Sequence, residues 1–296
     1  MWITQRAEQV GRSHRAAEKP CQDKTSSLCC NGVTAMALAD GAGSAHLSHE
    51  GAACAAEAAC EVLCHRFEEL SAAATPLEMR LCVLRAVSER ITQRAKELHV
   101  STAELACTLL AVAVQGDRYL LFHVGDGVIA YRKSGKLLVA SAPENGEFSN
   151  TTVFVTSQNA LLKSRVMRGR QPALDGFVLM SDGCETALYR KKNGHLAPIL
   201  NRLFQRAELL EQTVSEQMLQ SILCNVISRR TVDDCSLAIM VKEKTRSNRW
   251  NRLTLREKAG VLGILTGKRS RQRRQIRRAE RECVVSSAHS NSVLQK

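Results

Sequence analysis

Asp-Gly directly follows an apolar strand in MALADG (36–41), LLFHVGDG (120–127) and FVLMSDG (177–183). The order is reversed in DDCSLAIMV (233–241), where two acids lead into a strand. A carboxylate at the end of a buried strand is costly unless something neutralises it. Four such strand ends suggest that the acids converge on hard cations, because oxygen ligands suit magnesium and manganese. The sequence therefore predicts a metal site built from strand ends.

The hydrophobic pattern predicts an α+β layered domain over residues 1–241. Helical spacing of apolar residues and a Thr-Pro start indicate helices at 48–70, 75–98, 196–206 and 212–229. Apolar runs between turn residues indicate strands at 1–11, 26–40, 105–115, 118–124, 127–132, 151–156, 176–181 and 235–241. Strands and helices thus come in blocks, which argues against a regular βαβ series.

The net charge of +13 is concentrated near the C-terminus. Residues 242–282 hold fifteen Lys or Arg against four Asp or Glu, whereas residues 1–241 are almost neutral. We therefore expect 242–296 to be a basic, partly disordered tail, with nucleic acid or an anionic membrane as its possible partner. The absence of a long apolar run predicts no transmembrane segment, and the start of the chain does not resemble an export signal.

Twelve cysteines are many for 296 residues, but they show no zinc-ligand spacing. We interpret them as reduced thiols of a cytoplasmic protein. The cysteine-phosphatase signature Cys-x5-Arg occurs at 60–66, 184–190 and 224–230. None of the three has a glycine between Cys and Arg, although a phosphate-binding loop needs one, so we interpret them as coincidence.

The strand-end acids belong to an ordered series of short motifs, which are PCQD (20–23), ADGAGS (39–44), ACT (106–108), HVGDG (123–127), LMSDG (179–183) and VDDCS (232–236). Over roughly residues 5–241 the series resembles the PPM family of metal-dependent protein phosphatases, type 2C, in a bacterial subgroup. The resemblance implies a four-layer α-β-β-α sandwich of two antiparallel sheets. It also implies a site for two or three Mn²⁺ or Mg²⁺ ions at one end, between the sheets.

Each strand-end acid resembles a member of the family's metal site. Asp40 resembles the ligand that bridges two ions, and the carbonyl of Gly41 adds to it. Asp182 and Asp233 resemble the acids that complete the first ion. Asp126 resembles the ligand that shares a third ion with Asp182.

The PCQD motif adds two further residues to the predicted site. Asp23 resembles an acid that hydrogen-bonds to metal waters and supports catalysis from there. Gln22 stands where the family usually has Glu, so its contact with the second ion is expected to be weaker or through water. Asp234 replaces a usual Asn, and we expect it to support the turn.

Two other positions depart from the family pattern. Glu18 lies where a phosphate-binding Arg is common, and Ala42 lies where eukaryotic members have a candidate general acid, His. The spacing GxSHxxxxxPCQD resembles a bacterial subgroup. In that context we interpret His14 as a candidate for phosphate binding or proton donation.

The resemblance predicts a cytoplasmic serine/threonine protein phosphatase that uses a metal-bridging hydroxide to attack the phosphoryl group. Its partners would be phosphoproteins made by a cognate kinase, and the segment 141–170, at the position of the family's flap, would help to choose them. Two alternatives remain open. Gln22, Ala42 and the missing Arg also fit a weakly active module that binds phosphoproteins, and the basic tail fits a tether to nucleic acid or membrane.

Overall fold

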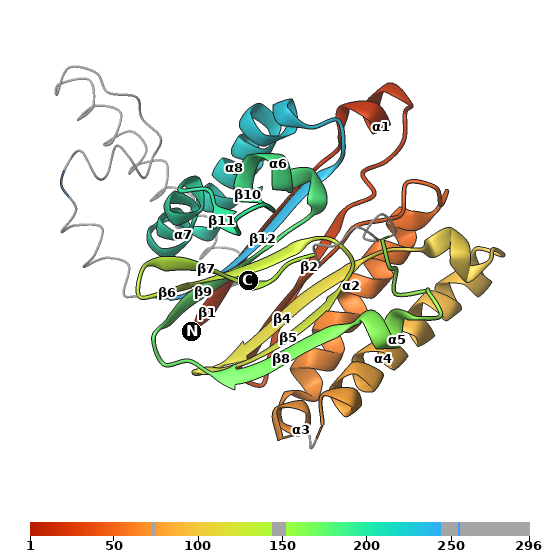
Figure 1. Cartoon of the computed structure of the whole chain (residues 1–296), viewed down its shortest axis with the longest axis horizontal. Helices are drawn as coiled ribbons and strands as arrows, with labels where there is room; N and C mark the ends of the chain where they lie inside the picture. The colour runs from red at the N-terminus through yellow and green to blue at the C-terminus, as the bar shows by residue number, and fades with distance from the viewer. Residues whose placement is uncertain (73–74, 144–151, 244–253, 255–296) are drawn as a thin grey trace, which may run out of the picture.

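Two five-stranded antiparallel sheets lie face to face in the computed structural model, which describes residues 1–72, 75–143, 152–243 and 254 (Figure 1). The first sheet has the order β1 (Trp2–Gln9), β12 (Cys235–Lys242), β9 (Leu174–Met180), β6 (Val128–Lys133) and β7 (Lys136–Ser141). The second has the order β2 (Lys24–Cys30), β3 (Val33–Ala39), β4 (Leu109–Gln115), β5 (Arg118–Val124) and β8 (Arg165–Arg170).

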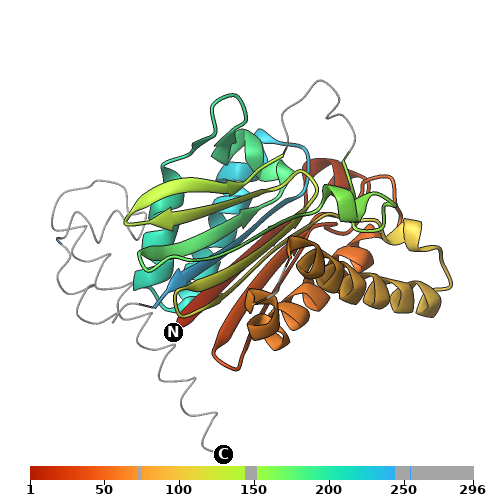
Figure 2. The ribbon, with the colours of Figure 1, turned by 60° about the horizontal axis from the view of Figure 1, so that its bottom comes forward.

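Helices cover the outer face of each sheet, which gives four layers (Figure 2). The second sheet is covered by α2 (Ser48–His65), α3 (Phe67–Ala72) and α4 (Pro76–Glu97), and the first by α7 (Ile199–Leu209) and α8 (Gln212–Ile222). Short elements complete the chain, namely α1 (Arg12–Ala16), α5 (Ala160–Lys163), α6 (Glu185–Leu188), β10 (Tyr189–Arg190) and β11 (His195–Leu196). The predicted α-β-β-α sandwich is confirmed.

Strand β3 shows how the sequence builds these layers. All seven of its residues are buried, because both faces of the sheet are covered. Ala35 and Ala37 pack toward α2 and α4, whereas Met36 and Leu38 pack between the two sheets. The small residues allow α2, itself rich in alanine, to approach the sheet closely, and the larger ones fill the space between the sheets.

Helix α4 begins as its sequence predicts. The Thr75 side chain caps the helix by accepting a hydrogen bond from the backbone N–H of Glu78. In turn, the Glu78 carboxylate accepts a hydrogen bond from the backbone N–H of Thr75. Pro76 occupies the first turn, where its missing N–H costs nothing. Residues Met79, Val83, Val87 and Ile91 then form the buried face of the helix.

Some predicted elements were wrong in their bounds or type. Residues 26–40, predicted as one strand, form the hairpin of β2 and β3, with Asn31 at positive φ in its turn. The described part of 151–156 is not a strand but a loop, in which the Val155 N–H donates to the Cys107 carbonyl. The strands β7 and β8 were not predicted. Residues 244–253 and 255–296, and with them most of the predicted tail, lie outside the described residues.

The acidic strand ends meet because of the strand directions. The ends of β3 and β5 lie beside the start of β4, and the end of β9 lies beside the starts of β6 and β12. Residues 125–127 join the end of β5 in one sheet to the start of β6 in the other. Both sheets therefore place their acidic turns at one end of the sandwich, where α1 and α5 also lie (Figure 1). None of the described helices is long and apolar enough to cross a membrane.

Candidate metal centre

The Asp40 turn is fixed to the strand beside it. The backbone N–H of Asp40 donates to Thr108 Oγ1 at 3.0 Å, and the N–H of Thr108 donates to the Asp40 carbonyl at 2.8 Å. A Cβ on Gly41 would lie 2.7 Å from Ser48 Cβ, at the start of α2. Glycine is therefore required at this close approach, which leaves the backbone beside Asp40 uncovered by a side chain.

The turns that carry Asp182 and Asp233 touch each other. A Cβ on Gly183 would lie 1.9 Å from the carbonyl oxygen of Asp234, so only glycine fits. Next to it, the N–H of Ser236 donates to Ser181 Oγ at 3.0 Å. The structure thus brings together two acids that are about fifty residues apart in the chain. Asp233 is exposed, whereas Asp182 is partly buried.

Asp126 lies in the link between the sheets. Its Oδ2 accepts a hydrogen bond from Thr152 Oγ1 at 2.6 Å. Thr152 belongs to the segment expected to form the flap, of which 144–151 lies outside the described residues. The sequence pattern did not indicate this contact, because no local signal connects positions so far apart.

Asp234 holds the N-terminal segment against this end of the sandwich. It accepts hydrogen bonds from the backbone N–H groups of Gly11 at 2.6 Å and Gln22 at 2.5 Å. His14 Nδ1 lies 3.0 Å from the same carboxylate. The sequence predicted that Asp234 supports only its own turn. The side chain, only 3% exposed, in fact also binds the N-terminal segment. It also determines where Gln22 and His14 lie.

Asp23 is fully buried, and neither of its carboxylate oxygens has a hydrogen-bond partner among the described residues. Burial raises the pKa of Asp23 to about 7, although the hydroxyls of Ser181 and Ser236, which lie near it without forming a hydrogen bond of normal geometry, lower it. Burial, followed by the charges of Asp23 and Asp182, raises the pKa of Asp40 well above its usual range. These effects arise because nearby carboxylates in a poorly hydrated site resist carrying charge together.

Asp182 connects the buried acids to the more exposed ones. Burial raises the pKa of Asp182 to about 6, and the charges of Asp126 and Asp233 add to the rise. The five predicted acids, Asp23, Asp40, Asp126, Asp182 and Asp233, are thus electrostatic neighbours. Within the described ranges, however, no three His, Cys, Asp or Glu side chains are already gathered at ion-binding distance.

The donor atoms at this end fit a hard divalent ion. Buried oxygens without a hydrogen-bond partner among the described residues are found on Asp23, Asp182 and Gln22. Most buried polar atoms in proteins have a partner, so this local group of orphans calls for an explanation. All are carboxylate or amide oxygens, which Mg²⁺ and Mn²⁺ prefer. The residues present therefore fit the ions that the sequence resemblance implies.

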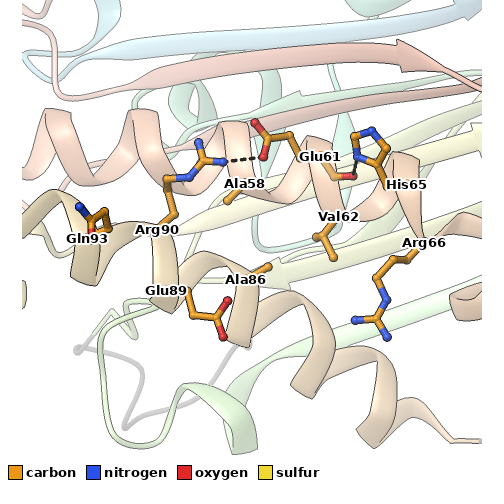
Figure 3. Close-up of a pocket in the computed structure, with 9 residues that line it drawn as sticks. All are labelled: Ala58, Glu61, Val62, His65, Arg66, Ala86, Glu89, Arg90 and Gln93. Atoms are coloured by element: carbon orange, nitrogen blue, oxygen red, sulfur yellow. Dashed lines mark hydrogen bonds and ion pairs between the residues drawn. The ribbon is translucent and has the colours of Figure 1, made fainter.

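Other features do not offer a comparable site. A groove of about 450 Å³ lies on the outer helical layer between α2 and α4, and Ala58, Val62 and Ala86 contribute to its lining (Figure 3). At its edge Arg90 already pairs with Glu61 at 2.5 Å. Two cysteines of the rival signature do not form thiolates readily, since burial raises the pKa of Cys60 to about 12 and that of Cys184 well above its usual range.

A sequence profile of the family described as protein phosphatase 2C matches residues 10–224, and the chain belongs to that family. This match confirms the predicted family and the predicted enzyme class, a protein-serine/threonine phosphatase.

Individual relatives agree with the family assignment. Serine/threonine-protein phosphatase 3 of Escherichia coli (strain K12) is 26% identical over 250 residues, which cover 80% of this chain and 97% of that protein. Two solved structures share the fold. A bacterial serine phosphatase has a TM-score of 0.56 at 14% identity, with 83% of this chain and 100% of that chain covered. The serine/threonine phosphatase of S. agalactiae has a TM-score of 0.53 at 17% identity, with 82% and 100% covered.

Proposed function

We propose that the protein hydrolyses phosphoserine and phosphothreonine in proteins with two or three Mn²⁺ or Mg²⁺ ions held at the Asp40 end of the sandwich. Asp40, the Gly41 carbonyl, Asp182 and Asp233 would hold the first ions, with Asp126 at a further ion. The observation that carries the proposal is the group of buried, unpartnered oxygens on Asp23, Asp182 and Gln22. Bound ions would lower the pKa of water and neutralise the phosphoryl oxygens.

The protein's own groups position the acids and a candidate proton donor. Asp23 is buried beside Asp40 and holds a proton more readily than an ordinary carboxyl, since its pKa is raised to about 7, chiefly by burial. His14 Nδ1 lies 3.0 Å from the Asp234 carboxylate, and we assign Nε2 as the ring atom that would give a proton to the leaving alkoxide. Ala42, where a His would act in other members, is buried among apolar residues and supplies no proton.

The cellular setting is also part of the proposal. We infer a cytoplasmic enzyme that reverses the action of a serine/threonine kinase, and the cysteines of the described residues, all free, agree with a reducing compartment. We further propose that 1–241 forms the catalytic domain. The basic segment 242–296 would then attract an anionic partner.

Hydrolysis of a phosphothreonine peptide tests the metal assignment. Initial rates are measured with Mn²⁺ and with chelator for the wild type, Asp182→Asn and Asp117→Asn. Asp117 is a matched control, because it is a turn aspartate at the opposite end of β5. We expect chelator and Asp182→Asn each to lower the rate at least about a hundredfold, and Asp117→Asn to leave it unchanged.

Two results would contradict the proposal. Turnover that is indifferent to chelator would exclude metal-assisted hydrolysis. Equal rates for Asp182→Asn and Asp117→Asn would show that the strand-end acids are ordinary turn residues. Binding of the phosphopeptide without any Mn²⁺-dependent turnover would instead support the alternative of a phosphoprotein-binding module.

A further inference from the structure

A basic loop lies directly beyond the Asp182 turn. Lys191 follows β10, at the start of the loop that returns through β11. Leu188 and Tyr189, just before it, are buried in the core under the first sheet. The buried residues before the loop therefore hold the backbone at its start, where Lys191 lies.

Lys191 is held by a buried acid. Its Nζ lies 2.7 Å from Oε2 of Glu185, in the short helix α6. The Glu185 side chain is 11% exposed, and its other oxygen, Oε1, is buried with no hydrogen-bond partner in the described part of the chain. The Lys191 side chain is 52% exposed. Glu185 thus fixes the ammonium group while solvent, or a ligand, can still reach it.

This pair lies within electrostatic range of the metal centre. Burial lowers the pKa of Lys191, but Glu185, Asp126 and Asp182 raise it above its ordinary value. Burial raises the pKa of Glu185, and the charge of Asp126 adds to that rise. Glu185 begins α6 only three residues after Asp182, so its ion pair holds the ammonium of Lys191 within electrostatic range of the two acids proposed to share the further ion.

The phosphate-binding Arg that is common in the family is not found at its usual position in the N-terminal segment. At the corresponding position Glu18 is exposed, with φ at +53°. The nearby His14 is engaged by Asp234 at 3.0 Å. A phosphate dianion that approaches the acidic end needs a cation besides the ions, and Lys191 is a cation already fixed there.

We propose that Lys191 binds the phosphate group of the phosphoserine or phosphothreonine substrate and that Glu185 is its positioning residue. The inference rests on the proposed hydrolysis at the Asp40 end. A lysine ammonium forms strong charge-assisted hydrogen bonds with phosphate oxygens. Because Glu185 fixes the ammonium before substrate arrives, less side-chain freedom is lost on binding.

Binding and turnover are measured for Lys191→Gln, Lys191→Arg and Lys192→Gln. The last is a matched control, since Lys192 is the exposed neighbour on the same loop. The probe for binding is a peptide with a non-hydrolysable phosphonate analogue of phosphothreonine, titrated by calorimetry into the Mn²⁺-loaded protein. We expect Lys191→Gln to raise both the Kd of this peptide and the KM of the phosphopeptide about tenfold, with a smaller change in kcat. Lys191→Arg should retain most of the binding, and Lys192→Gln should match the wild type.

Glu185→Gln tests the positioning role. It should raise KM in the same direction as Lys191→Gln but by less, because the ammonium remains and only its anchor is weakened. A purely structural role would instead lower the thermal unfolding temperature and leave KM unchanged, which would overturn this part of the proposal.

Two outcomes would overturn the role of Lys191. One is equal Kd and KM for Lys191→Gln and Lys192→Gln. The other is a Lys191→Gln variant that keeps the KM of the wild type but binds one more Mn²⁺ per chain. That result would show that Lys191 only neutralises Asp126 and Asp182 in place of an ion. If the wild type shows no Mn²⁺-dependent turnover, the proposed hydrolysis is wrong. The binding assay would still test Lys191 separately, because weaker binding of the phosphonate peptide to Lys191→Gln would support its contact with phosphate.

Discussion

At one end of β6, Arg132 is enclosed by groups that neutralise it, whereas the acids at the other end have no such partners. Arg132 pairs with the fully buried side chain of Glu208 in α7, and its guanidinium lies 4.8 Å from the centre of the Phe204 ring. Asp23 and Asp182, by contrast, retain buried oxygens without hydrogen bonds among the described residues. The charge of Arg132 is thus neutralised within the protein, although its Nε, 3.6 Å from Asp175 Oδ2, has no hydrogen bond among the described residues. Under the proposed function, the acids would instead be neutralised by a cation from outside.

The largest expected effect comes from removing the acid at the centre of the acidic end. Asp40→Asn should lower kcat/KM at least about a thousandfold, because it removes the proposed bridging ligand. The same change should raise the unfolding temperature measured in chelator, since it removes a buried charge whose pKa is raised by burial, Asp23 and Asp182. A loss of stability in chelator would mean that Asp40 is neutralised by the protein itself.

At the Arg132 end of β6, a substitution should lower stability and leave activity unchanged. Glu208→Gln leaves Arg132 buried without its charged partner and should cost about 3–5 kcal/mol of unfolding free energy. Activity per folded molecule should stay near that of the wild type, because the pair lies far from the acidic turns. Urea unfolding checks this expectation, with Glu89→Gln on the exposed face of α4 as the control. Equal midpoints for the two variants would contradict it.

His123 sharpens the comparison, because it is titratable, fully buried and kept neutral. It donates to the Gly125 carbonyl at 3.1 Å and accepts from Ser141 at 2.7 Å. Burial, helped by the charge of Arg165, lowers the pKa of His123 to about 3. In the unfolded chain the imidazole takes a proton near pH 6.5, so its contribution to stability is present above that pH and is lost as the pH falls toward 3.

The resulting pH dependence can be measured. Lowering the pH from 7 to 5 should remove about 2 kcal/mol of unfolding free energy through His123 alone. His123→Gln should therefore show a shallower loss of stability over this range in urea unfolding. An identical pH slope in both proteins would show that His123 is protonated in the folded state.

The smallest expected effect concerns the contact of Thr152 with Asp126. Thr152→Val removes the 2.6 Å hydrogen bond to Asp126 Oδ2 but keeps the size of the side chain. The concentration of Mn²⁺ needed for half-maximal activity should change by about threefold. An unchanged Mn²⁺ dependence would show that this bond does not position the acid for an ion.

The acids that the sequence identified share a local signal. An apolar strand followed by Asp-Gly can be recognised in a single segment, and strand direction then brings Asp40, Asp126 and Asp182 to one end. The residues that sequence reasoning missed depend on distant partners. Nothing around Asp234 indicates Gly11 or Gln22, and nothing around Glu185 indicates that its partner will be the lysine that follows β10.

The wrongly predicted strand at 151–156 and the missed strand β8 also depend on distant partners. Residues 152–155 have high strand propensity, but they form a loop in which the Val155 N–H donates to the Cys107 carbonyl. The strand β8, whose sequence RVMRGR has little apolar character, forms because the edge of β5 accepts it. Pairing with a sheet edge is a long-range property, so local propensity alone cannot decide it.

The strand order of the first sheet has a consequence for the synthesis of the protein. β12 is the last strand along the chain, yet it lies between β1 and β9. On the ribosome, where a chain emerges from its N-terminus, β1 must therefore wait for residues 235–242 before it gains its neighbour. Asp233 emerges only just before them. A nascent or prematurely terminated chain thus lacks one strand of the first sheet and one of the acids proposed to bind metal, so we expect no phosphatase activity from it.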